Sequence, residues 1–229
     1  LPAGPKIENT ISRIKWAEEH GFPDEWFIDS GAPDTLTQVA AIAHHTENLR
    51  IGVAVTPVYT RSPSVLAASA NVISQLLPDR FVMGLGSSSQ TIMGQWNGIP
   101  LDKPLTRVKE TAQLVRTMLS GDKTDFDGET LYSRGYRQAP LENPPPIYLA
   151  ALRSSMVEMA AEFGDGVIFN LWPKKALARV RVLLTATWPR LRLRDRPRRP
   201  LRPASSPRAP FPLRRRKPLC PWAPIQGAT

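Results

Sequence analysis

Short apolar runs alternate with amphipathic helical segments along the first 170 residues, and this alternation constrains the fold more than any other feature. The apolar runs predict strands at 26–28, 51–56, 81–86, 147–151 and 166–170. The segments between them carry apolar residues at helical spacing. Parallel neighbouring strands need a crossover connection, so strands joined by helices predict a parallel α/β sheet, either doubly wound or closed into a barrel.

One segment departs from this rhythm. Asp127-Gly128 has the chemistry of a tight turn, and the flanking residues 125–126 and 130–132 predict a β-hairpin. The hairpin interrupts the alternation of strands and helices without ending it.

Charge is distributed unevenly along the chain. The net charge is +10, but residues 1–176 hold 16 Lys and Arg against 19 Asp and Glu (−3), whereas residues 177–229 hold 14 against 1 (+13). The basic average therefore describes the last quarter of the chain, and it does not by itself indicate a nucleic-acid partner for the main body.

The composition of residues 177–229 predicts a second region, separate from the domain formed by residues 1–176. Ten prolines fall within 189–229 among many arginines, with no hydrophobic period, which predicts disorder. A shift of reading frame in GC-rich DNA would produce such an Arg/Pro-rich segment. The alternative is a genuine basic tail that binds nucleic acid through phosphate contacts.

The remaining composition predicts a soluble, cytoplasmic protein. A single cysteine, Cys220, excludes an internal disulfide framework or a cysteine-based metal cluster. No apolar run approaches the roughly 18 residues needed to cross a bilayer. The three histidines, His20, His44 and His45, fall in helical segments away from the carboxyl ends of the strands, so no metal site is expected.

Polar or small residues follow the predicted strands. In a parallel sheet the chemistry gathers at the carboxyl ends of the strands. The candidate segments there are Asp29-Ser30, Ala54-Val55-Thr56, Gly86 to Ser89, Ala150 to Ser154, and Asn170.

The order of several segments over residues 18–172 resembles the luciferase-like superfamily, and within it the branch that depends on the deazaflavin coenzyme F420. The resemblance is carried by 17–22 (AEEHGF), 49–57 (LRIGVAVTP), 60–63 (TRSP), 79–87 (DRFVMGLGS), 146–151 (PIYLAA) and 161–167 (AEFGDGV). It implies a (β/α)8 barrel in which the five strands correspond to about the second to the sixth. The barrel is then expected to be incomplete.

The resemblance also implies roles for individual residues. Ala54, Val55 and Thr56 match a bulged strand whose cis peptide backs the cofactor ring. Gly84 and Gly86 match glycines that let the cofactor approach the backbone, and Ser87 and Ser88 would contact it.

Asp29 matches an acidic residue near the ring or the substrate. Ser30 stands where relatives commonly have histidine, and serine cannot donate a proton near neutral pH as imidazole can. Asp29 and Ser30 are therefore the catalytic candidates, and the alternative for Asp29 is a helix cap.

A turn directly after the fourth apolar strand predicts an anion site. Ser155 and Glu158 have the spacing of a capping box at a helix start. The resemblance implies that this turn contacts the cofactor phosphate, with four candidate residues: Ala151, Leu152, Arg153 and Ser154.

These features favour an oxidoreductase that transfers a hydride between coenzyme F420 and a small organic substrate, and the family suggests a homodimer. The alternatives are an FMN-dependent monooxygenase of the same fold, or an inactive truncated chain whose tail binds nucleic acid.

Overall fold

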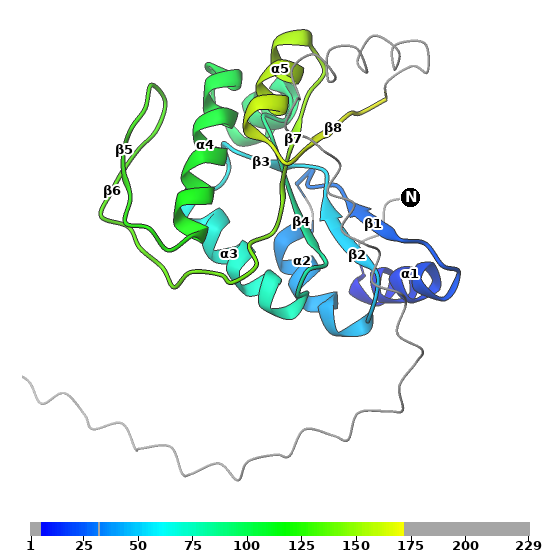
Figure 1. Cartoon of the computed structure of the whole chain (residues 1–229). Helices are drawn as coiled ribbons and strands as arrows, with labels where there is room; N and C mark the ends of the chain where they lie inside the picture. The colour runs from blue at the N-terminus through cyan, green and yellow to red at the C-terminus, as the bar shows by residue number, and fades with distance from the viewer. Residues whose placement is uncertain (1–5, 32, 172–229) are drawn as a thin grey trace, which may run out of the picture. The chain divides into compact units, whose positions relative to one another are not determined.

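The computed structural model describes residues 6–31 and 33–171, and its centre is a parallel β-sheet (Figure 1). The strand order is β1-β2-β4-β7-β8, with β3 paired to β4. Every pairing in this sheet is parallel. The strands are β1 (Asp24–Phe27), β2 (Arg50–Val53), β3 (Thr56–Pro57), β4 (Phe81–Gly86), β7 (Ile147–Ala150) and β8 (Gly166–Ile168).

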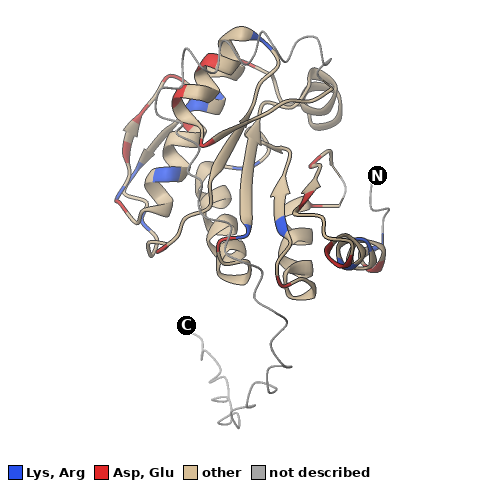
Figure 2. Ribbon diagram, turned by 45° about the vertical axis from the view of Figure 1, so that its right-hand side comes forward, with Lys and Arg blue, Asp and Glu red and all other residues tan. Residues whose placement is uncertain are grey.

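Helix α1 (Ile7–Glu19) precedes β1. The connections from β1 to β2, β3 to β4, β4 to β7 and β7 to β8 contain α2 (Thr35–Ile42), α3 (Pro63–Leu76), α4 (Pro104–Leu119) and α5 (Ser154–Phe163), respectively. The predicted β-hairpin is present as β5 (Asp125–Asp127) and β6 (Tyr132–Arg134), which pair with each other outside the main sheet. Charged residues lie mainly on helices and on the hairpin, and the strands β4, β7 and β8 carry none (Figure 2).

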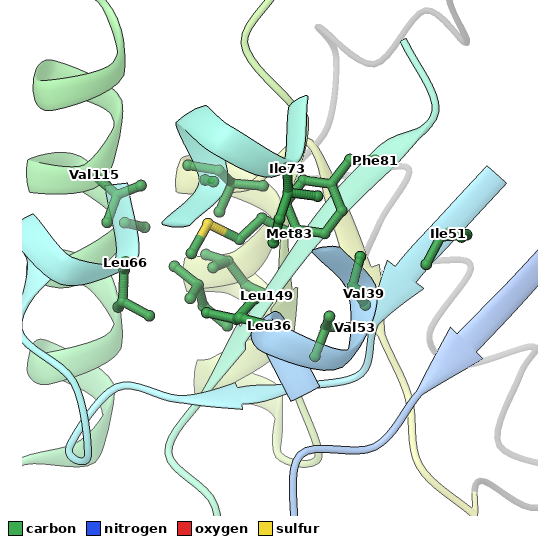
Figure 3. Close-up of a cluster of buried hydrophobic side chains, with 14 of the residues drawn as sticks. Leu36, Val39, Ile51, Val53, Leu66, Ile73, Phe81, Met83, Val115 and Leu149 are labelled. Carbon is green, nitrogen blue, oxygen red and sulfur yellow. The ribbon is translucent and has the colours of Figure 1, made fainter. Parts of the chain in front are cut away.

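The hydrophobic core lies between one face of the sheet and the helices (Figure 3). Because side chains alternate along a strand, every second residue of β2 and β4 points into this core. The sheet contributes Ile51, Val53, Phe81, Met83 and Leu149, and the helices contribute Leu36, Val39, Leu66, Ile73 and Val115.

The opposite face of the sheet is lined by glycines and two aromatic rings. A Cβ atom at Gly52 would lie 2.4 Å from the Trp26 ring, and one at Gly166 would lie 2.6 Å from the Tyr148 ring. The centroids of the two rings are 6.0 Å apart. Each ring therefore occupies space that the neighbouring strand leaves free by carrying glycine.

The five predicted strands are confirmed, with two changes of detail. The predicted strand 51–56 is interrupted after Val53, where the Ala54–Val55 peptide bond is cis as the resemblance implied, and it resumes as β3. A π-helical segment, Thr91–Trp96, follows β4 and was not predicted. The predictions for residues 177–229 lie outside the described residues.

Candidate active site at the carboxyl ends of the strands

The parallel pairing places the carboxyl ends of the main strands at one edge of the sheet. Asp29 follows β1 at this edge and is 8% exposed. Arg61, which follows β3, donates a hydrogen bond of 2.7 Å from Nη1 to Asp29 Oδ2. Its Nη2 group binds Asp34, so one guanidinium joins two carboxylates.

Asp34 is the N-cap of α2, because its Oδ2 accepts a hydrogen bond of 2.8 Å from the Thr37 amide. The alternative role considered for Asp29, a helix cap, therefore belongs to Asp34. Ser30 is exposed beside the buried Asp29. Asp29 and Ser30 thus both follow the carboxyl end of β1, as predicted, but Asp29 is buried and Ser30 is exposed.

The pKa values of Asp29 and Asp34 are shifted in opposite directions by burial and by their hydrogen-bonded neighbours. Burial raises the pKa of Asp29, and the neighbouring Arg61 offsets this only in part. Burial also acts to raise the pKa of Asp34, but the hydrogen bonds from Thr37 and Arg61 outweigh it and lower that pKa. Asp29 is therefore the carboxyl group here that takes up a proton more readily than an ordinary aspartate.

Arg61 was not among the predicted site residues. Its segment, 60–63, is part of the family resemblance, which implies no role for this arginine. Arg61 and Asp29 are 32 residues apart in sequence and meet because β1 and β3 end at the same edge. The signal available in the sequence was the single arginine between the predicted strand 51–56 and the helix that follows it.

Neighbouring parts of the chain leave no room for a Cβ atom at Gly84 or Gly86. A Cβ atom at Gly84 would lie 1.9 Å from the carbonyl oxygen of Val53, and one at Gly86 would lie 2.5 Å from Val55 Cγ2. Glycine is needed at both positions because β2 and the segment after it pack directly against them.

The other predicted residues near β4 differ in how deeply they are buried. Thr56 is fully buried, and its hydroxyl has no hydrogen-bond partner within the described part of the chain. Ser87 and Ser88 are half-buried at the end of β4, and Ser88 has a left-handed backbone with a φ of 64°. Ser87 and Ser88 are therefore reachable at the edge, whereas Thr56 is not.

The predicted capping box at α5 is wrong. The helix begins at Ser154 with Arg153 as its N-cap, so Ser155 lies inside the first turn. No side chain caps this helix start. Ala151 is buried and its amide donates to Ile168 O at 3.0 Å, while Leu152 and Arg153 are exposed.

The uncapped start of α5 leaves amide groups of its first turn available to an anion. The exposed Arg153 adds a positive charge at the same place.

A surface depression lies away from the predicted site residues, and the described residues hold neither a metal-binding cluster nor a membrane-spanning helix. A shallow depression lined by Lys123, Thr124, Asp125, Arg134 and Gly135 lies at the hairpin and includes none of the predicted site residues. Among residues 6–31 and 33–171, no cluster of three or more His, Cys, Asp or Glu could hold a metal ion. In the same ranges no helix is both long and apolar enough to cross a membrane.

Comparison with known proteins identifies the family. The sequence model of the luciferase-like monooxygenases matches residues 1–208, so the chain belongs to this family. Among curated relatives, a 5,10-methylenetetrahydromethanopterin reductase of Methanolobus tindarius is 32% identical over 171 residues, covering 74% of this chain and 52% of that protein. An F420-dependent glucose-6-phosphate dehydrogenase of Tsukamurella paurometabola is 30% identical over 152 residues, covering 62% of this chain and 45% of that protein.

Solved structures agree on the fold. The coenzyme F420-dependent tetrahydromethanopterin reductase of Methanopyrus kandleri superposes with a TM-score of 0.73 at 20% identity, covering 82% of this chain and 60% of that one. The oxygenating component of a Pseudomonas putida diketocamphane monooxygenase, solved with FMN, gives a TM-score of 0.70 at 15% identity, covering 81% and 58%. The described sheet is thus a parallel half-barrel of the luciferase-like type. The chain spans about half the length of the curated relatives it matches.

Proposed function

We propose that the chain is part of an oxidoreductase that transfers a hydride between coenzyme F420 and a small organic substrate. The observation that carries the proposal is the 30–32% identity to relatives that include F420-dependent dehydrogenases. Residues 1–176 would supply one partial barrel domain, and family resemblance favours a cytoplasmic homodimer.

The residues at the start of α5 fit the anionic part of such a cofactor. The uncapped amides of the first turn and the exposed Arg153 together suit a phosphate group. Leu152 and Ser154 flank Arg153, and Ala151 fixes the turn through its bond to β8. These four residues would hold the cofactor phosphate.

The ring of the cofactor would lie against the segment between β2 and β3. Val55 projects over Gly86, so its side chain forms part of the surface at this edge. Ala54 and Val55 would back the ring, with Ser87 and Ser88 as polar neighbours. The bound cofactor would supply hydride chemistry, and the protein would supply orientation and exclusion of water.

Asp29 is the group best suited to hold a proton at this edge. Its raised pKa and its burial distinguish it from the neighbouring Asp34. Ser30 would contribute a hydrogen bond to the substrate, since it is exposed and carries no ionisable group. Substrate orientation would then matter more than acid catalysis.

Titration with the two cofactors tests the proposal. Coenzyme F420 and FMN are each added to the full chain, and binding is followed by their fluorescence. Arg153→Gln is expected to weaken F420 binding by about tenfold, because it removes a charge-assisted hydrogen bond to phosphate. Arg134→Gln is the matched control, since Arg134 lies on the hairpin and its removal should leave the affinity unchanged.

An FMN-dependent monooxygenase is the second candidate. The FMN-bound neighbour with a TM-score of 0.70 favours it. Tight binding of FMN without binding of F420 would replace the first proposal by this one. Binding of neither cofactor would contradict both.

A further inference from the structure

Large apolar side chains are exposed at the candidate site. Ile28, directly after β1, is 73% exposed, and Trp96, in the segment between β4 and α4, is 63% exposed. Leu152, after β7, is exposed as well. Exposure of large apolar groups at one edge is typical of a binding surface.

Trp96 lies beside the candidate catalytic residues. Its ring atoms Cε3 and Cζ3 are 3.8 Å from the position that a Cβ atom of Gly31 would occupy. Gly31 follows Asp29 and Ser30 in the loop after β1. The indole of one loop is thus packed against the loop that carries Asp29.

The segment that carries Trp96 is held in place by its own contacts. Met93 is fully buried, and its carbonyl accepts a hydrogen bond of 2.9 Å from the Ile99 amide. Asn97 Nδ2 donates a bond of 2.6 Å to Ile92 O. The Trp96 ring is therefore presented to solvent on an anchored segment while the adjacent Met93 fills the core.

The surroundings of Trp96 offer no free cation from the same segment. Residues 81–101 contain no Asp, Glu, Lys or Arg. The nearby Arg61 is already bound to both Asp29 and Asp34. The exposed Arg153 is assigned to the cofactor phosphate, so a phosphate or carboxylate on the substrate would meet the buried Asp29 carboxylate here without a free guanidinium from Arg61 or Arg153 to balance its charge.

We infer that Trp96 is a specificity-determining residue and that the substrate part lying beside Asp29 and Ser30 is neutral and apolar, such as an aromatic or alicyclic carbonyl compound. This inference rests on the proposed function and names the substrate class of the same site. A neutral substrate would distinguish this chain from relatives that are named F420-dependent glucose-6-phosphate dehydrogenases.

Ligand-observed NMR titration of the full chain tests the inference without requiring turnover. The probes are acetophenone, which is neutral and aromatic, and glucose 6-phosphate, which is anionic. Trp96→Ala is compared with Trp16→Ala, because Trp16 is also exposed but lies on α1. Circular dichroism checks that both variants are folded.

Acetophenone is expected to bind saturably to the wild type and to Trp16→Ala, and about tenfold more weakly to Trp96→Ala, since stacking on the indole is lost. Glucose 6-phosphate is expected to bind Trp96→Ala as well as it binds the wild type, because any binding of its phosphate at the start of α5 does not involve Trp96. Unchanged acetophenone affinity in Trp96→Ala, absence of acetophenone binding, or glucose 6-phosphate binding that Trp96→Ala weakens would each overturn the inference.

A separate F420 titration of the same samples distinguishes the two proposals. If F420 does not bind but acetophenone binding depends on Trp96, the proposed function fails and the apolar site stands. If F420 binds and acetophenone binding does not depend on Trp96, the proposed function stands and the substrate class is wrong.

Discussion

Arg61 Nη1 lies 2.7 Å from Asp29 Oδ2 and ties the loop after β1 to the start of α3. The arginine side chain is 18% exposed and the aspartate side chain 6%. Both charges are therefore removed from water, and each needs the other to offset the cost of burial.

Replacing Arg61 by Gln should destabilise the fold by about 3 kcal/mol, because it leaves the Asp29 carboxylate buried without its cation. Loss of the cation should also raise the pKa of Asp29 further. A carboxyl group with a raised folded-state pKa stabilises the fold fully below its unfolded pKa, and this contribution is lost as pH rises through the folded pKa. The deficit relative to wild type should therefore be larger at about pH 7 than at about pH 5, measured by urea denaturation.

Arg134→Gln is the control for this prediction. Arg134 pairs with Asp127 on the exposed hairpin, and its loss should change stability by less than about 0.5 kcal/mol. A deficit for Arg61→Gln that is the same at both pH values would contradict the assigned role of Asp29.

Gly84→Ala should destabilise the fold by more than about 3 kcal/mol, since the new Cβ would lie 1.9 Å from the Val53 carbonyl oxygen and force β2 away from β4. Thermal unfolding measures the loss. Gly98→Ala has open space around its Cβ but a φ of +66°, so it should cost only about 1 kcal/mol. Equal effects would show that packing across the sheet is not what requires glycine at position 84.

Glu110 should give the fold a dependence on acid pH. This residue of α4 is 6% exposed, and its carboxylate accepts hydrogen bonds from the amides of Glu129, Thr130 and Leu131 and from the Thr130 hydroxyl, at 2.6–2.9 Å. Burial acts to raise its pKa, but these hydrogen bonds outweigh burial and lower it. The resulting stability is present above the unfolded pKa of a glutamate and is lost as pH falls through the lowered folded pKa.

Glu110→Gln should therefore cost about 2 kcal/mol near neutral pH and should flatten the decline in stability toward acid pH. Glu129→Gln is the control, because the Glu129 side chain is exposed. An unchanged acid profile in Glu110→Gln would contradict the prediction.

Glu18 should protect the loop before β2. Its carboxylate accepts hydrogen bonds of 2.6–3.2 Å from the amides of Glu47, Asn48 and Leu49. Glu18→Ala should cost about 2 kcal/mol and should speed hydrogen exchange at the Leu49 amide. Glu19→Ala alters the exposed neighbour and should leave that exchange rate unchanged.

The sequence predicted much of the architecture because its information there is local. Strands such as 81–86 are short apolar runs, and the helices between strands show their period over a few turns, so neither required knowledge of distant residues. The position of Asp29 after β1 followed from the same pattern. The family resemblance added the cis peptide at Ala54–Val55.

Helix starts were harder to place. The spacing of Ser155 and Glu158 suggested a capping box, but the bond of Ala151 to β8 fixes where the chain leaves the sheet, and α5 begins at Ser154, two residues before the start that an N-cap at Ser155 would give. Sequence spacing alone does not record this tertiary contact.

The sequence by itself determined the succession of parallel βα units, because hydrophobic periodicity and turn chemistry are written along the chain. Only the tertiary structure decided that Arg61 binds Asp29, that Trp96 lies against Gly31, and that Gly84 is required by Val53. Each of these contacts joins residues at least 31 positions apart, and sheet register and strand order bring them together.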